Sequence, residues 1–457
     1  MHFAQFVRPS SGCASYLLGS EGRGACAVVD PAWEVEQYLQ EAQRRGLRIT
    51  HVIETHAHAD HLSGARRLAA RTGAPILAHP QFQPAFPFEP VLDGATVALG
   101  EVRLSALHTP GHRPDCLCLG VADGSRGEGP WFVLTGDTLF VGDVGRPDLG
   151  QSPEDAADRL YDSLFGRLLT LPDYTEVYPG HVAGSPCGRS MSPKGASTLG
   201  YERLFNAALQ APSRAEFIRR VVEHLPPQPP NFMGLVQKNR GLLPVRESVP
   251  MRLSPAETLD HRRRGALLVD LRAPGPFGQG HVEGAVNVPL RQGHFPTSAG
   301  WAISAETPLL LVLEQEADLA RAVDALSSAG LDWIEGWVEG GIAAWRAAGL
   351  PVRSLAQLGA RELRAELAGP QKPALVDVRP REDWARGHIP SAISIPLAEL
   401  EQRLAELDRD RPVAFVCGSG VNSSVAASKA LRSGLDAWNV EGGTAAWGRA
   451  GLDLETG

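Results

Sequence analysis

Short apolar runs alternate with amphipathic stretches along the first 245 residues. Runs rich in β-branched residues predict strands, and apolar residues spaced three and four positions apart predict helices. We expect strands at 25–29, 49–54, 75–78, 102–107, 131–134 and 176–178, and helices at 34–45 and 63–71. The proline-rich stretch 225–230 predicts a stiff connector. We therefore predict one large α/β domain over residues 1–248.

The last two hundred residues contain an internal repeat. An apolar strand at 267–272 and a Gly-His pair at 280–281 recur 107 positions later, at 374–379 and 387–388. Each copy closes on a Glu-Gly-Gly segment that leads to a tryptophan. The repeat predicts two homologous α/β domains, 249–353 and 354–457.

Composition and charge exclude several classes of function. A length of 457 residues corresponds to about three domains. With 52 acidic and 44 basic side chains, the net charge of -8 gives no basic surface for nucleic acid or an anionic membrane. Six scattered cysteines do not make a disulfide framework, and no apolar run is long enough to span a bilayer. We expect a cytoplasmic protein that acts on small molecules.

The most specific motif follows the predicted strand 49–54. His56, His58, Asp60 and His61 place three imidazoles and a carboxylate within six residues. So many polar side chains at a strand end cannot all point into an apolar core, so they must converge on something charged. Further candidate ligands stand at later strand ends: His112, Asp137 and His181. Imidazole with carboxylate suits zinc or iron.

These residues resemble the metallo-β-lactamase superfamily, in which such a motif builds a metal site at the edge of an αββα sandwich. The resemblance implies two alternatives. The full set could hold two zinc ions, as in glyoxalase II-like thioester hydrolases. Alternatively, His56, His112 and Asp137 could hold one Fe(II), as in persulfide dioxygenases, which leaves His58, Asp60, His61 and His181 as additional ligands or as supporting residues.

Two further residues extend the same resemblance. Arg146 lies in the segment 143–148, which is similar to one that stands near the thiol-substrate site of persulfide dioxygenases. It could pair a substrate carboxylate or phosphate, or it could form a surface salt bridge. Cys187 follows the last motif histidine and could lie close to the metal or be a buried, inert thiol. Cys116 and Cys118 alternate on an apolar strand and are predicted to be core residues.

A cysteine loop stands out in the final repeat. Cys417 ends the apolar strand 412–416, is followed by small residues, and faces the start of a helix. Backbone N–H dipoles of such a loop stabilise a thiolate or persulfide anion. Residues 354–457 resemble the rhodanese family, which implies that Cys417 is the sulfur carrier. The loop that would hold the persulfide consists of Gly418, Ser419, Gly420, Val421, Asn422 and Ser423.

The middle repeat lacks this chemistry. Alignment of the two repeats places Leu313 opposite Cys417, and the residues after Leu313 include two glutamates and an aspartate but no glycine. Negative charge there would oppose an anionic persulfide. We predict an inactive rhodanese-like domain that serves structure, docking or positioning.

The order of the three predicted domains resembles bacterial persulfide dioxygenase-sulfurtransferase fusions. The resemblance implies one Fe(II) per chain and oxidation of a low-molecular-weight thiol persulfide by dioxygen to sulfite and free thiol. Sulfite would then accept sulfur from Cys417 and give thiosulfate. A dinuclear zinc hydrolase and a non-enzymatic sulfur relay are the alternatives. The carrier thiol, which could be glutathione, coenzyme A, bacillithiol or another, is left open, as is a homo-oligomer.

Overall fold

The computed structural model describes residues 1–9, 11–183, 185–223, 225–247, 249–290 and 295–456. It divides into two compact units, Met1–Val245 with Ser327–Gly330, and Arg246–Leu326 with Leu331–Gly457. The predicted boundary residue Ser248 lies outside the described residues. Within the described part of the chain, no helix has the length and apolar character that a membrane crossing requires.

The first unit contains two six-stranded sheets. The first sheet runs in chain order: β1 (His2–Val7), β2 (Ala14–Ser20), β3 (Ala25–Val29), β4 (Arg48–Ile53), β5 (Ile76–Ala78) and β6 (Glu89–Pro90). The second has the spatial order β12-β11-β10-β9-β8-β7. Its strands are β7 (Thr96–Leu99), β8 (Val102–His108), β9 (Leu117–Asp123), β10 (Phe132–Gly136), β11 (Glu176–Pro179) and β12 (Ser197–Thr198).

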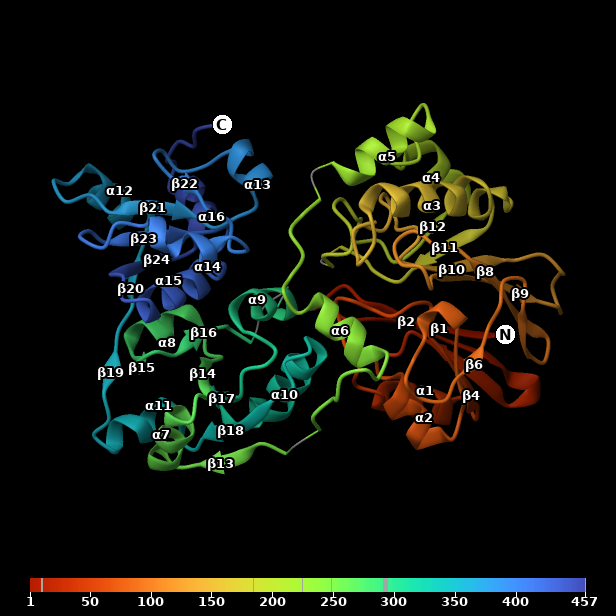
Figure 1. The fold of residues 1–457 in the computed structure, drawn as a ribbon, viewed down its shortest axis with the longest axis horizontal. Coiled ribbons are helices and arrows are strands. Elements are labelled where there is room, and N and C mark those ends of the chain that lie inside the picture. Colours follow the sequence, from red (N-terminus) through yellow and green to blue (C-terminus); the bar gives the residue numbers. More distant parts are fainter. Residues whose placement is uncertain (10, 184, 224, 248, 291–294, 457) are drawn as a thin grey trace. The chain divides into compact units, whose positions relative to one another are not determined.

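Helices cover the outer faces of the two sheets (Figure 1). α1 (Glu36–Arg44) and α2 (Ala65–Thr72) pack on the first sheet, and α3 (Pro153–Phe165) and α5 (Arg214–Val222) on the second. The unit also contains α4 (Leu199–Phe205) and α6 (Phe232–Asn239). The inner faces share an apolar core that includes Leu18, Val29, Leu104 and Leu119. Full burial of each such side chain contributes roughly 1.5–3 kcal/mol. The predicted αββα sandwich is confirmed.

The second unit contains two five-stranded parallel sheets with the same strand order. The first is β13-β18-β17-β14-β16 and the second is β20-β24-β23-β21-β22. The strands of the first are β13 (Met251–Leu253), β14 (Leu267–Asp270), β16 (Val286–Asn287), β17 (Leu309–Val312) and β18 (Ile334–Val338). Those of the second are β20 (Ala356–Leu358), β21 (Ala374–Asp377), β22 (Ile393–Ser394), β23 (Val413–Val416) and β24 (Ala437–Val440). The matching order confirms that the two repeats share a fold.

Helices connect the parallel strands, because a parallel pair needs a crossover connection. The middle repeat has α7 (Pro255–Arg263), α8 (Pro274–Gln279), α9 (Phe295–Ala302), α10 (Leu319–Ser328) and α11 (Gly341–Ala347). The final repeat has α12 (Ala360–Ala368), α13 (Arg381–Arg386), α14 (Leu400–Arg403), α15 (Asn422–Arg432) and α16 (Gly443–Arg449). A short pair, β15 (His281–Val282) and β19 (Val352–Arg353), completes the unit.

The Asp-x-Arg motif shared by the repeats is structural. Arg379 pairs with Asp377 at 2.6 Å and donates to the carbonyl oxygen of Gly387 at 2.8 Å. Arg272 makes the same contacts with Asp270, at 2.6 Å, and with Gly280, at 2.9 Å. The motif therefore ties a strand end to the following loop in both copies, whether or not the cysteine is present.

Candidate metal centre and cysteine loop

Parallel strand ends deliver two of the predicted ligands to one place. Asp137 directly follows β10, and His181 follows its parallel neighbour β11, with Gly136 opposite Pro179 in the register. A Cβ atom on Gly180 would lie 2.6 Å from the Asp137 carboxylate, so only glycine leaves room for this carboxylate. β4 in the other sheet delivers His56, and the loop after β8 delivers His112. The site therefore lies where the two sheets meet.

His56, His112 and Asp137 form one buried group. Their ligand atoms all lie within 4.8 Å of one another. The Oδ2 atom of Asp137 is 3.8 Å from His56 Nε2 and 3.4 Å from His112 Nε2. Exposed fractions are 1% or less, and none of these three atoms has a hydrogen-bond partner. Three buried, unpartnered ligand atoms that face one another fit a metal ion, because each would otherwise carry the full cost of desolvation.

The remaining polar atoms of the triad are occupied, which fixes its orientation. His56 Nδ1 is 3.0 Å from Thr55 Oγ1, which itself donates to Asp30, so the ring donates from Nδ1. His112 Nδ1 donates to the carbonyl oxygen of Arg146 at 2.9 Å. Both Nε2 atoms therefore carry lone pairs directed at the centre, as metal-binding histidines require.

Burial and the neighbouring histidines set the charge state of the triad. It lowers the pKa of His56 well below its ordinary value and also lowers the pKa of His112. Both imidazoles are therefore neutral near pH 7, which is the form that binds a metal. Burial by itself would raise the pKa of Asp137, but His181, His56 and His112 outweigh it and lower that pKa. The triad thus offers two neutral nitrogens and one carboxylate.

His58 belongs to a different cluster. Its Nε2 lies 3.2 Å from Asp30 Oδ1 and 3.3 Å from Glu54 Oε2, and these three residues form their own buried group. Burial acts to lower the pKa of His58, but the two carboxylates raise it well above its ordinary value. His58 therefore faces the carboxylates of Asp30 and Glu54 and not the triad.

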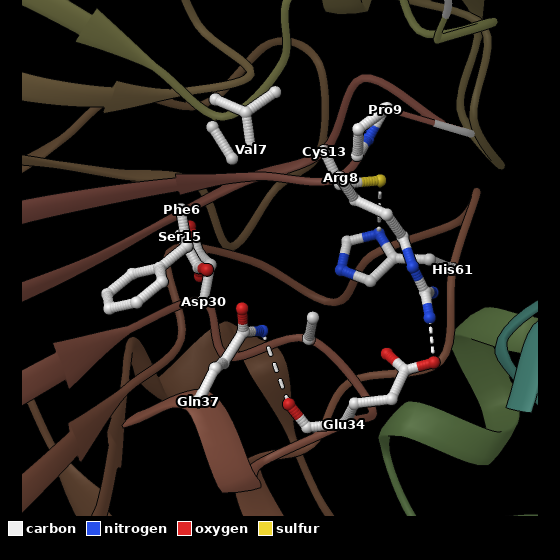
Figure 2. Close-up of a pocket in the computed structure, with 12 residues that line it drawn as sticks. Phe6, Val7, Arg8, Pro9, Cys13, Ser15, Asp30, Glu34, Gln37 and His61 are labelled. Atoms are coloured by element: carbon white, nitrogen blue, oxygen red, sulfur yellow. Dashed lines mark hydrogen bonds and ion pairs between the residues drawn. The ribbon is translucent and has the colours of Figure 1, made fainter. Parts of the chain in front are cut away.

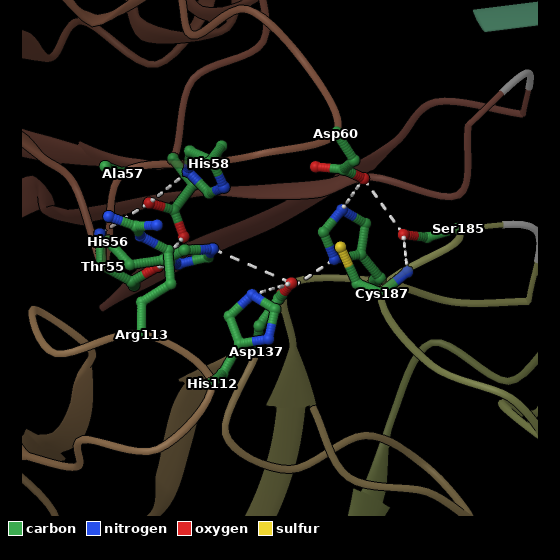
Figure 3. Close-up of polar contacts among 12 residues, drawn as sticks. Thr55, His56, Ala57, His58, Asp60, His112, Arg113, Asp137, Ser185 and Cys187 are labelled. Carbon is green, nitrogen blue, oxygen red and sulfur yellow. Dashed lines mark hydrogen bonds and ion pairs between the residues drawn. The ribbon is translucent and has the colours of Figure 1, made fainter. Parts of the chain in front are cut away.

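Asp60, His61 and His181 gather around Cys13. His181 Nδ1 donates to Asp137 Oδ1 at 2.8 Å, and its Nε2 lies 2.8 Å from Asp60 Oδ2. Burial opposes it, yet these carboxylates raise the pKa of His181 well above its ordinary value. His181 thus bridges Asp137 and Asp60 as a cation and holds the carboxylate of the triad in place. Figure 3 follows these contacts from Asp137 to Asp60 and Ser185.

Cys13 is the thiol of this second cluster. Its Sγ is 3.5 Å from His61 Nδ1 and 3.7 Å from Asp60 Oδ2. Burial acts to raise the pKa of Cys13, but the imidazoles of His61 and His181 bring it down to about 6. The sequence offers no motif around this cysteine. A bridge between Cys13 and His181, which joins the start of β2 to the end of β11, brings this cysteine into the cluster.

Cys187 lies beside the triad. It forms a buried group with Asp137 and His181, and its backbone N–H donates to Ser185 at 3.1 Å. Burial raises the pKa of this thiol well above its ordinary value. Cys187 is therefore close to the candidate metal centre and is held as a neutral thiol.

The guanidinium of Arg146 contacts other residues of the chain. It makes a bidentate pair with Asp148, at 2.7 and 2.8 Å, and donates to the carbonyl oxygens of Pro186 and Pro226. Only 3% of Arg146 is exposed. These contacts favour the salt-bridge interpretation over substrate binding, and the salt bridge is buried.

Removal of this arginine should destabilise the first unit. We expect Arg146→Met to lower the free energy of unfolding by about 3 kcal/mol, because Asp148 would keep a largely buried charge without its partner. Urea titration followed by circular dichroism measures the loss. The control, Arg214→Met, removes exposed ion pairs with Asp158 and Asp162 and should leave the free energy of unfolding almost unchanged. Equal losses in the two variants would contradict the structural role of Arg146.

A cavity of about 310 Å³ lies beside the flanking clusters (Figure 2). Cys13, His61 and Asp30 line one part, and the ion pair of Arg8 with Glu34 lines another. None of the triad residues is among the residues that line it. The cavity therefore reaches the clusters beside the triad and not the triad itself.

Sequence patterns missed the residues that hold the motif loop. Asp115 accepts from the backbone N–H of Ala57 at 2.7 Å. Asn239, at the end of α6, donates to the carbonyl oxygens of His58 and His61, both at 2.9 Å. Asp30 follows β3 directly, so the rule that drew attention to Asp137 could have found it. Asn239 has no such signal, because α6 is remote in sequence from the motif.

The cysteine loop has the geometry expected of an anion cradle. Cys417 follows β23 and is 4% exposed. Its Sγ accepts from the backbone N–H of Gly420 at 3.2 Å and from Ser423 Oγ at 3.4 Å. A Cβ atom on Gly443 would lie 2.0 Å from the Cys417 carbonyl oxygen, so glycine is required for α16 to pack against the loop. The loop thus directs donors at the sulfur before any ligand arrives.

The middle repeat places Leu313 at the equivalent position. Leu313 follows β17 as Cys417 follows β23, and it is buried. The chain then enters a short turn at Glu316–Asp318 before α10 begins. Glu314 and Glu316 are exposed. The equivalent loop therefore carries carboxylates where the final repeat carries glycine and serine.

Comparisons with known proteins identify both parts of the chain. The sequence model of the Metallo-beta-lactamase superfamily matches residues 9–181, and that of the Rhodanese-like domain matches residues 254–348 and 359–450. The crystal structure of a metallo-beta-lactamase from Staphylococcus aureus is similar, with 31% identity and a TM-score of 0.65. The match covers 74% of this chain and 98% of that one.

Two curated relatives point to different chemistries. The mitochondrial persulfide dioxygenase of Bos taurus is 30% identical over 178 residues, which is 39% of this chain and 66% of that protein. The hydroxyacylglutathione hydrolase of Rhodospirillum rubrum is 34% identical over 173 residues, which is 37% of this chain and 62% of that protein. The chain thus matches less than two thirds of either relative.

Proposed function

The chain belongs to the metallo-beta-lactamase superfamily and continues into two rhodanese-like domains, and on this premise we propose that it is an iron-dependent persulfide dioxygenase coupled to sulfur transfer. The first unit would oxidise a low-molecular-weight thiol persulfide with dioxygen. Cys417 in the final repeat would carry sulfane sulfur to the sulfite so formed. The dioxygenase relative supports the first step, and the rhodanese-like domains support the second.

The observation that carries the proposal is the set of three unpartnered atoms in the triad. His56 Nε2, His112 Nε2 and Asp137 Oδ2 are buried, face one another and lack hydrogen-bond partners. Two imidazoles and one carboxylate are the donor set of non-haem Fe(II) oxygenases. A ferrous ion bound there would supply open coordination positions for a persulfide and dioxygen.

The surrounding residues support a single ion at this triad. Thr55 and the Arg146 carbonyl fix the imidazole rings, and His181 fixes the carboxylate of Asp137. His58 is engaged by Asp30 and Glu54, and Asp60 by His61 and Ser185. The Nε2 atoms of His58 and His181 make no hydrogen bond either, but each lies at ion-pair distance from a carboxylate of its own cluster. We therefore assign the flanking residues to positioning the triad.

The proposed reactions balance without a further oxidant. One persulfide, one dioxygen and one water give one thiol, one sulfite and two protons. A second persulfide transfers its terminal sulfur to the Cys417 thiolate and leaves as a thiol. Sulfite then attacks that terminal sulfur, the bond to Cys417 breaks, thiosulfate leaves and the thiolate is restored. Gly420 N–H and Ser423 O–H are placed to stabilise the anion at each stage.

A hydrolase is the second candidate, and one cluster favours it. Cys13, Asp60, His61 and His181 form a four-residue buried group that could bind a second ion, and the hydroxyacylglutathione hydrolase relative has comparable identity. In that case the first unit would bind two zinc ions and consume no dioxygen. Metal content and oxygen consumption therefore separate the two functions.

Oxygen uptake tests the proposed function. The full-length chain is reconstituted with iron under anaerobic conditions and then offered the persulfides of glutathione, coenzyme A and bacillithiol in oxygenated buffer. We expect uptake of one dioxygen per sulfite formed with at least one of them. A chain loaded with iron that consumes no dioxygen with any persulfide, while the zinc-loaded chain cleaves a glutathione thioester, would refute the proposal.

The middle repeat should not gain activity from a cysteine alone. We expect Leu313→Cys in a Cys417→Ser background to transfer no more sulfur from thiosulfate to cyanide than Cys417→Ser itself. The introduced thiol would lack donors like those of Gly420 and Ser423 and would have Glu314 beside it. Transfer that approaches the rate of the unmodified chain would contradict this interpretation of the loop.

A further inference from the structure

The middle repeat makes polar contacts with α15, the helix that begins at the cysteine loop. Ser298 Oγ, on α9, donates to Asn422 Oδ1 at 2.9 Å. Ser424 Oγ donates to Asn287 Oδ1, at the end of β16, at 2.6 Å. The backbone N–H of Asn287 donates to Ser428 Oγ at 3.0 Å. The contacts therefore engage the first two turns of α15 from a domain that lacks a carrier cysteine.

Ser423 lies between the two residues that are held. Across the repeats, Asn422 accepts a hydrogen bond and Ser424 donates one. Between them, Ser423 Oγ donates to Cys417 Sγ at 3.4 Å. Ser423 and Ser424 are completely buried. Because neighbouring helical residues point about 100° apart, rotation of this turn about the helix axis would change all three contacts together. The middle repeat thus fixes the direction of the Ser423 hydroxyl.

Asn287 is itself rigidly held by its own domain. Its Nδ2 donates to the carbonyl oxygens of Asp270 and Arg272, at 3.0 and 2.9 Å, and its side chain is completely buried. Those carbonyls belong to the strand end that the Asp270–Arg272 pair stabilises. The equivalent position of the final repeat is Ser394, whose hydroxyl has no hydrogen-bond partner. An amide long enough to reach α15 is therefore a feature of the middle repeat.

We propose that the middle repeat acts as the positioning domain of the cysteine loop, through Asn287 and Ser298. The inference rests on the proposed role of Cys417 as sulfur carrier. Both residues act through α15 and touch neither the sulfur nor a substrate. By fixing Asn422 and Ser424, they hold the start of α15 so that Ser423 O–H stays directed at the sulfur anion. The repeat that has Leu313 in place of a cysteine thus positions the cysteine loop of the other repeat.

Removal of the two contacting hydroxyls tests this role in the full-length chain. Ser298→Ala and Ser424→Ala each delete one donor across the repeats, and neither disturbs the bonds from Asn287 to Asp270 and Arg272. Alkylation of Cys417 by iodoacetamide, followed by peptide mass spectrometry, gives the rate at each pH. We expect alkylation of the double variant near neutral pH to be about tenfold slower, because a less directed donor stabilises the thiolate less. The turnover number for thiosulfate-to-cyanide transfer should fall about tenfold, with little change in KM.

Controls separate positioning from general damage. Ser433→Ala removes a hydroxyl at the other end of α15, where its partner is the Lys429 carbonyl oxygen, and should leave the alkylation profile unchanged. Ser298→Thr keeps a hydroxyl and should therefore keep most of the alkylation rate that Ser298→Ala loses. Oxygen uptake should remain intact in every variant. If the double variant unfolds, Ser298→Ala alone tests the proposal, with an expected decrease in alkylation rate of about threefold.

Two results would overturn the proposal. One is an alkylation profile of the folded double variant that matches the unmodified chain. The other is a decrease of equal size in the alkylation rate of Ser433→Ala. Alkylation reads the thiol directly, so it decides the positioning role even if Cys417 carries no sulfur. That separate failure would show itself as unchanged transfer in Cys417→Ser.

Discussion

Asp137→Ala is expected to abolish both iron binding and oxygen uptake. The carboxylate supplies Oδ2 to the triad, and its Oδ1 holds His181, so one substitution removes a ligand and releases a buried cation. Loss of a ligand together with its charge should lower activity by at least about a hundredfold. Iron per chain after anaerobic reconstitution and the rate of oxygen uptake are measured on the same sample.

A surface carboxylate provides the matched control. Asp93 belongs to the same unit and pairs with Arg167 at an exposed position. Asp93→Ala should keep full iron content and full oxygen uptake. An Asp137→Ala chain that keeps its oxygen uptake while free of iron would show that the triad is not the reaction centre.

Cys417→Ser is expected to change the product and leave oxygen uptake intact. The thiol and the triad belong to separate compact units, and the chemistry proposed for each needs only its own residues. Without the carrier, sulfite has no persulfide to attack on the protein, so sulfite should accumulate in place of thiosulfate. At least about nine tenths of the thiosulfate should be lost at equal oxygen consumption, since serine is a far weaker nucleophile than a thiolate.

The first variant serves as the reciprocal control for the second. Asp137→Ala should still transfer sulfur from thiosulfate to cyanide, because its cysteine loop is unchanged. Both anions are quantified by chromatography after a fixed amount of dioxygen has been consumed. A ratio of sulfite to thiosulfate in Cys417→Ser that equals the ratio in the unmodified chain would exclude Cys417 from turnover.

The strands that lead to the candidate metal centre are predicted accurately from the sequence. Strand β3 coincides with its predicted range, and β4, β8, β10 and β11 differ from theirs by one or two residues. These strands are buried apolar runs that end at polar motifs. The apolar run therefore predicts the strand, and the polar motif predicts where it ends. The repeat also predicts the shared strand order of the second unit, because homologous sequences bury the same positions.

The division of the metal motif into clusters could not be predicted. His56 and His58 are two residues apart in one loop, yet the first faces Asp137 and the second faces Asp30 and Glu54. Spacing along an irregular loop does not determine side-chain direction as it does in a helix or strand. Cys13 and Asn239 reach the site from distant parts of the chain, so only the folded structure shows them.

The polar contacts between the repeats could not be predicted from the sequence either. Asn287 occupies a position that is serine in the final repeat, and a single asparagine at a strand end is most often a turn or capping residue. Its contacts become visible only in the folded structure, where α15 packs against β16.

The partners of Arg146 could not be predicted from the sequence either. A guanidinium suits a substrate carboxylate as well as it suits a salt bridge. In the structure it contacts Asp148 and the carbonyl oxygens of Pro186 and Pro226.

The most direct test is the number and kind of metal ions per chain. The full-length chain is offered iron and zinc separately under anaerobic conditions, and bound metal is determined by elemental analysis together with oxygen uptake. We predict one iron per chain, lost in Asp137→Ala, and dioxygen consumption only by the iron form. Two tightly bound zinc ions per chain, with no oxygen uptake by the iron form, would contradict the assignment of a single iron to His56, His112 and Asp137.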